Sequence, residues 1–228
     1  TLSLHDALPI WDSRTFFYNA GTNDALSEAD IPVDSIAAEG VRLFYLGYLN
    51  LMGRLDAVGA DGSTGAARLL ARAQAAGMVT CVDLVSAATS SFAATVAAAL
   101  PHIDYLFLNE IEAARATGVS ISGPADRQAL LAAAIALQQG GAKTVVLHTG
   151  AVALWLDKVP HWVAPEPVDP AQIVSPVGAG DAFCAGVVYA IHEGWTPMRA
   201  LTLGHRAAAA SLRGATATDG IPPLADLI

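Results

Sequence analysis

Short apolar runs rich in β-branched and aromatic residues alternate with helical patterns through the middle of this chain of 228 residues. Each run has the length of a single strand, and the segments between runs are long enough to hold a crossover helix. Strands that alternate with helices favour a parallel sheet with helices on both faces. We therefore expect a three-layer α/β/α fold, with strands at 41–46, 78–84, 103–108 and 143–148.

Helical patterns and a hairpin complete this expected architecture. Residues 64–76 and 125–139 have helical periodicity, and the second pattern ends at Gly140, a typical stop signal. The apolar segments 151–156 and 159–164 are separated by only two residues. This arrangement predicts an antiparallel hairpin at the edge of an otherwise mainly parallel sheet.

Polar residues stand where three of the expected strands end. Asp83 closes the second run, Asn109 follows the third and His148 closes the fourth. Ligands of open α/β sheets lie outside the carboxyl ends of the strands. We expect a binding site at this edge of the sheet.

The run 175–181, Ser-Pro-Val-Gly-Ala-Gly-Asp, precedes an apolar stretch that indicates a buried helix. Glycines there let the backbone approach a ligand closely, and a helix start offers N–H groups and a positive dipole end to an anion. Asp181 would lie in the first turn, beside that anion. This combination suits the transfer of a phosphoryl group to a hydroxyl, although the dipole alone also favours such an Asp.

The same run excludes two other phosphate-binding motifs. The next glycine after Gly180 is Gly186, which is too far along the chain for a G-x-G-x-x-G dinucleotide fingerprint. No Gly-Lys-Ser/Thr follows, so the run is not a Walker loop.

Residues 178–183, Gly-Ala-Gly-Asp-Ala-Phe, resemble the D-T-x-G-A-G-D signature of the ribokinase-like (PfkB) carbohydrate kinases. The resemblance extends from about residue 14 to the C-terminal end and implies a ribokinase-like fold. It implies that Asp181 is the catalytic base, and that Gly178, Ala179 and Gly180 form an anion hole. It also implies ATP and Mg²⁺ as cofactors and a sugar or sugar-like acceptor.

One departure from the signature concerns a possible monovalent cation. Ser175-Pro176 stands where the family usually has Asp-Thr. That Asp helps to form a monovalent-cation site in several members, so activation of this chain by such a cation is in doubt.

Further segments resemble the family's nucleotide and metal elements. Asn109 and Glu112 match its N-x-x-E element, which places Mg²⁺ and phosphate, usually through water. Asp83 resembles its strand-end Asp near the phosphates, and Gly150 the glycine of a turn beside the nucleotide. Arg206 lies in a segment that resembles the late helix flanking the adenine.

Each of these matches also has a purely structural interpretation. The spacing of Asn109 and Glu112 is that of a capping box. Asp83 could cap the helix that follows its strand. The small residues around Arg206 could simply permit close packing of helices. His148 could be no more than a hydrogen-bonded residue at a strand end.

Composition limits the class of partner. The 12 Lys and Arg against 21 Asp and Glu give a net charge of −9, which argues against a nucleic-acid partner that needs a broad basic surface. No apolar stretch has the length of a membrane span. Cys81 and Cys184 both lie in apolar runs without a disulfide framework, so we expect a cytoplasmic protein.

The N-terminal decapeptide, residues 1–10, resembles translated sequencing-adapter read-through and does not begin with Met. We expect these residues to be a non-native segment, and residues 11–228 to be a partial kinase domain with a short strand at 14–18. The family normally begins with strands, a lid and a Gly-Gly…Asn sugar-binding segment, which this sequence does not match. The identity of the acceptor and the usual homodimer through the lid therefore lie beyond these residues.

Three functions are compatible with the sequence. The first is an ATP-dependent carbohydrate kinase, a phosphotransferase with an alcohol group as acceptor. The second is a non-catalytic nucleotide- or sugar-binding relative, or an inactive fragment of a sugar kinase, as Ser175 and the missing sugar-binding segment suggest. The third is another α/β nucleotide enzyme such as a dehydrogenase, against which the missing G-x-G-x-x-G counts.

Overall fold

The computed structural model describes residues 19–228, which belong to two compact units. The larger unit comprises residues 20–164 and contains the sheet, whereas the described part of the smaller unit is Asn19 with residues 165–228. The expected non-native segment at 1–10 and the expected strand at 14–18 lie outside the described residues.

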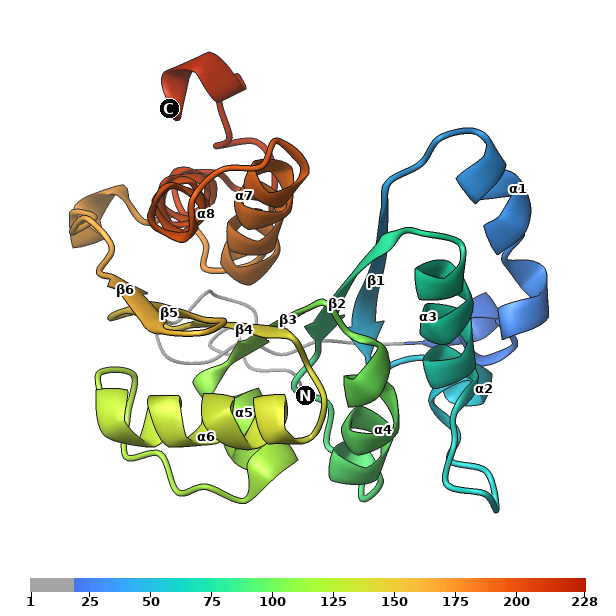
Figure 1. The fold of residues 1–228 in the computed structure, drawn as a ribbon. Helices are drawn as coiled ribbons and strands as arrows, with labels where there is room; N and C mark the ends of the chain where they lie inside the picture. Colours follow the sequence, from blue (N-terminus) through green and yellow to red (C-terminus); the bar gives the residue numbers. More distant parts are fainter. Residues whose placement is uncertain (1–18) are drawn as a thin grey trace, which may run out of the picture. The chain divides into compact units, whose positions relative to one another are not determined.

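Six strands form a single sheet in the larger unit, in the order β1-β2-β3-β4-β5-β6 (Figure 1). The first four are parallel, and β5 and β6 add an antiparallel edge. The expected mainly parallel sheet and its hairpin are therefore confirmed. The strands are β1 (Leu43–Leu49), β2 (Val79–Leu84), β3 (Tyr105–Asn109), β4 (Thr144–His148), β5 (Ala153–Leu156) and β6 (Pro160–Val163).

Helices connect the parallel strands, and neighbouring strands in the sheet are also consecutive in the chain. Because such crossovers are right-handed, the connecting helices all lie on one face of the sheet. They are α3 (Gly65–Ala75), α4 (Phe92–Ala99), α5 (Glu110–Thr117) and α6 (Arg127–Gln139). Shorter helices are α1 (Val33–Ala38) and α2 (Gly53–Asp56), with 3₁₀ turns at Gly21–Asp24, Glu28–Asp30, Leu100–His102, Pro170–Gln172 and Leu224–Asp226.

The main core lies between this face of the sheet and its helices. Alternate strand residues point into it, among them Val82, Leu84, Leu106, Leu108, Val145 and Leu147, all nearly inaccessible to solvent. Burial of each such side chain is worth about 1.5–3 kcal/mol. Because side chains alternate along a strand, Asp83, Asn109 and His148 occupy positions on the opposite face.

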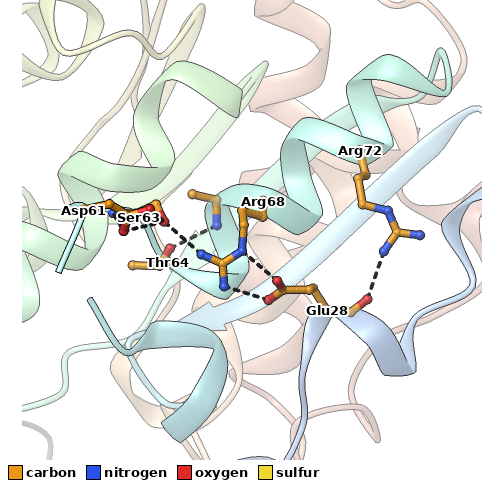
Figure 2. Close-up of polar contacts among 7 residues, drawn as sticks. Glu28, Asp61, Ser63, Thr64, Arg68 and Arg72 are labelled. Carbon is orange, nitrogen blue, oxygen red and sulfur yellow. Dashed lines mark hydrogen bonds and ion pairs between the residues drawn. The ribbon is translucent and has the colours of Figure 1, made fainter. Parts of the chain in front are cut away.

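The segment before β1 is attached to α3 by charged side chains (Figure 2). Arg68 Nε donates to Glu28 Oε1 at 2.6 Å and Arg68 Nη2 donates to Glu28 Oε2 at 3.1 Å. Arg72 Nη1 donates to the Glu28 carbonyl at 3.1 Å. The hydrogen bond from Arg68 lowers the pKa of the Glu28 carboxyl, so the ion pair persists over a wide pH range.

Two long helices dominate the smaller unit: α7 (Ala179–His192) and α8 (Pro197–Ser211). The apolar stretch after Asp181 is thus helical, as expected. The two helices approach closely at Gly186 and Gly204, because a Cβ on Gly186 would lie 3.0 Å from the Leu203 carbonyl oxygen. None of the helices in residues 19–228 is both long and apolar enough to span a membrane.

Candidate functional site

The densest group of candidate residues lies where β3 passes into α5. Asn109 Oδ1 accepts hydrogen bonds from the N–H groups of Ile111 and Glu112, both at 2.9 Å. Glu112 Oε2 accepts a hydrogen bond from the Asn109 N–H at 2.9 Å. The N-x-x-E element is therefore a complete capping box at the start of α5.

Ser86, in the loop after β2, joins this group. Its hydroxyl donates to Glu112 Oε1 at 2.8 Å and accepts a hydrogen bond from Asn109 Nδ2 at 3.3 Å. Glu112 is only 4% exposed, and this burial raises the pKa of its carboxyl although the donors from Asn109 and Ser86 oppose the rise. The sequence analysis did not identify Ser86 as a candidate. Its position three residues after the strand-end Asp83 could have indicated that it lies near the same edge of the sheet.

Asp83 and His148 lie near the same edge of the sheet. Asp83 is buried and pairs with Phe107 of β3, two residues before Asn109. His148 is the last residue of β4 and pairs directly with Asn109. The structure therefore brings the strand-end residues of β2, β3 and β4 to one edge.

Gly150 lies in the exposed turn between β4 and β5. Thr149 organises this turn, since its Oγ1 donates to the Pro124 carbonyl at 2.7 Å and accepts from the Val152 N–H at 3.0 Å. A Cβ on Gly150 would meet no atom within 4 Å. Packing within the chain does not require glycine there, and its missing side chain leaves the backbone open to a ligand.

The Gly-Ala-Gly-Asp run forms the start of α7 in the smaller unit. Gly178 is the N-cap, with a φ of +85°, and a Cβ there would clash with Ala217. Glycine is therefore required by both backbone conformation and space. Asp181 is the third residue of α7 and is exposed.

Gly178, the N-cap residue of α7, has no side chain that could cap the helix. The N–H groups at a helix start have no partner within the helix, so they are available to an anion. The Ala179 N–H makes only a long hydrogen bond, 3.4 Å, to the Pro176 carbonyl. The start of α7 thus has the form of an anion site.

The loop that leads into α7 is tied to the end of α8. The Leu212 carbonyl accepts hydrogen bonds from the N–H groups of Val174 at 2.8 Å and Ser175 at 3.2 Å. Ser175 Oγ accepts from the Val177 N–H at 3.2 Å. Ser175 thus stabilises the turn, and it offers no carboxylate to a monovalent cation.

Arg206 lies on the exposed side of α8, where its Nη1 donates to the Leu227 carbonyl at 2.9 Å. It lines a surface pocket of about 230 Å³ together with Trp195, Arg199 and Ile228. Its neighbours His205 and Ala207 are buried. The buried neighbours fit the packing interpretation and the exposed guanidinium fits a ligand contact, so the role of Arg206 stays a prediction.

The donor set of Asn109 and Glu112 can be compared with what Mg²⁺ requires. Within residues 19–228, no group of three or more His, Cys, Asp or Glu side chains could hold a metal ion alone. Mg²⁺ commonly uses one or two carboxylates and completes its shell with water and substrate phosphates. Because the side-chain oxygens of Asn109 and Glu112 already accept hydrogen bonds within the chain, the pair fits an ion that arrives with a nucleotide and keeps its own water shell.

The candidate residues therefore fall into two groups. Asp83, Asn109, Glu112 and Gly150 belong to the larger unit, whereas residues 178–181 belong to the smaller one.

Comparison with known proteins adds a family and a fold. The family model described as pfkB family carbohydrate kinase matches residues 12–223. A provisionally assigned ribokinase II from E. coli, in complex with ATP and Mg²⁺, is similar in structure with a TM-score of 0.68. It is 17% identical in sequence, and the match covers 94% of this chain and 66% of that one.

Two further solved structures are similar. A ribokinase from Arabidopsis thaliana, complexed with ribose and ATP, has a TM-score of 0.60 at 22% identity, covering 70% of this chain and 49% of that one. An adenosine kinase from Schistosoma mansoni, in complex with 2-fluoroadenosine, has a TM-score of 0.66 at 19% identity, covering 86% and 58%. This chain thus spans about half to two thirds of the length of these proteins, and the expected ribokinase-like fold is confirmed.

Proposed function

We propose that this chain, which belongs to the pfkB family of carbohydrate kinases, takes part in ATP-dependent phosphoryl transfer to a hydroxyl group of a sugar or sugar-like substrate. The observation that carries the proposal is the start of α7, where amides without a side-chain cap lie beside the exposed Asp181. Relatives solved with ATP and Mg²⁺, and with ribose and ATP, support the choice of cofactors and acceptor.

In this proposal Asp181 is the general base. Its carboxylate accepts the proton of the acceptor hydroxyl while that oxygen forms a bond to the γ-phosphorus of ATP, and ADP leaves. The N–H groups of Gly178, Ala179 and Gly180 stabilise the negative charge on the phosphoryl oxygens. Positioning and electrostatic stabilisation of this kind supply most of the catalysis in phosphoryl transfer.

The residues of the larger unit hold the nucleotide in this proposal. Asn109 and Glu112 hold Mg²⁺ through water, and the ion neutralises part of the phosphate charge when it is bound. Asp83 lies near the phosphates, and the backbone at Gly150 contacts the nucleotide. Arg206 lies beside the adenine in this proposal, with its Nη1 held by the Leu227 carbonyl.

We place the reaction in the cytoplasm. Both cysteines of the chain, Cys81 and Cys184, are free and buried. Proteins without disulfides are typical of a reducing compartment.

The substitution Asp181→Asn tests the assignment of the base. We expect transfer of the γ-phosphoryl group to a panel of sugars and nucleosides to fall by about 10²–10⁴-fold, the usual contribution of a general base. Binding of Mg²⁺-ATP, followed by calorimetry, should persist. Glu193→Gln is the matched control, because Glu193 is an exposed carboxylate directly after α7.

The outcomes separate the rival functions. Near-native turnover in Asp181→Asn shows that the base is a different group. Binding of Mg²⁺-ATP without transfer to any acceptor by the full protein favours the non-catalytic alternative. Binding of NAD(H) in place of ATP points to the dehydrogenase alternative.

A further inference from the structure

The loop between β2 and α4 is fastened to α5 by two side chains. Arg115 Nη1 donates to the carbonyls of Ser86 and Ala87, each at 3.0 Å. Ser86 Oγ donates in turn to Glu112 Oε1 at 2.8 Å. Glu112 and Arg115 are three residues apart on α5 and so share one side of the helix, from which they hold the loop together.

The Glu112 carboxylate depends on this loop for one of its two hydrogen bonds. Its Oε2 is held by the Asn109 N–H of its own helix start, whereas its Oε1 is held by Ser86 from a different strand connection. A buried charged oxygen without a donor is costly, so the loss of the Ser86 hydroxyl favours another side-chain orientation. Ser86 also receives the Asn109 Nδ2 donor and thereby contacts both candidate magnesium residues.

We propose that Ser86, held in place by Arg115, is a positioning residue that orients the Glu112 carboxylate and the Asn109 amide toward the Mg²⁺ of a bound nucleotide. This inference rests on the proposed function. Ser86 takes no part in bond making or breaking, and it acts only through the two residues that it contacts. Residues that hydrogen-bond to the ligands of a metal ion without touching the ion typically contribute about 10–100-fold to the affinity for the metal.

The test measures binding and not turnover. Mg²⁺ is titrated into the full chain with a fluorescent ATP analogue at fixed concentration, and the same analogue is titrated in EDTA. We expect Ser86→Ala to weaken the apparent Mg²⁺ affinity about tenfold and to leave binding in EDTA unchanged. Ser86→Thr, which keeps the hydroxyl, should restore the wild-type affinity.

Three additional variants sharpen the result. Ser122→Ala is the matched control, since the Ser122 hydroxyl donates to Asp126 Oδ2 at 2.6 Å at the start of another helix, α6. In a Glu112→Gln background, Ser86→Ala should cause a smaller loss than in the wild type, because only its contact with Asn109 then remains to be lost. Arg115→Met should weaken the Mg²⁺ affinity in the same direction, because it releases the loop.

The possible results distinguish a failure of the proposed function from a failure of the inference about Ser86. Analogue binding that is absent or independent of Mg²⁺ in the wild type overturns the proposed function, and this inference with it. A Mg²⁺ dependence that neither Ser86→Ala nor Arg115→Met alters overturns only the inference. An equal loss with Mg²⁺ and in EDTA also overturns it, because the loop then supports the fold and not the metal site.

Discussion

At the scale of single residues, Asp56 shows how burial changes a carboxyl group. Its Oδ2 accepts a hydrogen bond from the Met52 N–H at 2.5 Å, but its Oδ1 is buried and has no hydrogen-bond partner within residues 19–228. Burial raises the pKa of Asp56 from 3.8 to about 6, against the opposing effect of hydrogen bonds from the backbone of Met52 and Asn50. The folded state therefore keeps this proton at pH values where the unfolded chain has lost it.

This pKa predicts a loss of stability with rising pH. Between about pH 4 and pH 6 the folded state binds more protons at Asp56 than the unfolded state, so the free energy of unfolding falls as pH rises. The stabilisation is fully present below pH 3.8 and is lost as pH passes through about 6. Asp56→Asn should remove this part of the pH dependence, as measured by urea unfolding at a series of pH values.

An exposed carboxylate provides the control for this prediction. Asp61 is exposed, and the hydrogen bonds from Ser63 lower the pKa of its carboxyl, so Asp61→Asn should not flatten the curve between pH 4 and pH 6. An Asp56→Asn variant that follows the wild-type curve throughout this range would contradict the account of Asp56.

Sequence reasoning at this scale succeeded where the interaction is local. Asn109 and Glu112 are three residues apart, so their capping contact follows from spacing alone. Ser86 and Glu112 are 26 residues apart, and they meet only because β2 and β3 pair in the sheet. Asp56 was missed for the same reason, since its burial depends on packing and not on a motif.

At the scale of elements, apolar runs located the strands well but located some ends less well. β1 continues to Leu49, three residues beyond the predicted end, after a register shift between Leu46 and Leu49. Tyr48 has a φ of +59° within this shift, a conformation that alternation cannot reveal. Helix α6 begins at Arg127 because Asp126 caps it, with Oδ1 accepting from the Ala129 N–H at 3.1 Å.

The packing of α7 on α8 predicts the effect of one methyl group. In Gly204→Ala the new Cβ would lie 2.8 Å from Val187 Cγ2 and 2.9 Å from two atoms of the Phe183 ring. Overpacking of this kind costs about 1–3 kcal/mol, which exceeds the gain of about 1 kcal/mol from the higher helix propensity of alanine. We expect a net loss in the free energy of unfolding by urea.

Gly123→Ala is the matched substitution, because a Cβ at Gly123 would meet nothing within 4 Å. It should leave the free energy of unfolding unchanged or slightly raised. A Gly204→Ala variant as stable as Gly123→Ala would show that the two helices are not in the close contact described here.

At the scale of the whole molecule, the alternation of strands and helices was enough to predict an α/β fold with a mainly parallel sheet, and the resemblance of residues 178–183 to the family signature implied the ribokinase-like form. Hydrophobic patterning is local, and right-handed crossovers leave few ways to arrange consecutive parallel strands. Which of the candidate residues act together was harder to predict, since they belong to two compact units. In the functional proposal, residues 178–181 act on the transferred phosphoryl group, and Asn109 and Glu112 hold the Mg²⁺ of the nucleotide.

Hydrogen–deuterium exchange with and without Mg²⁺-ATP tests this central claim most directly. If one nucleotide is held by both groups, the amides of residues 179–181 and those of residues 110–112 should both gain protection when Mg²⁺-ATP is added. Both gains should shrink when EDTA removes the metal. Protection confined to one of the two segments, or absent from both, would contradict the claim that both take part in phosphoryl transfer from Mg²⁺-ATP.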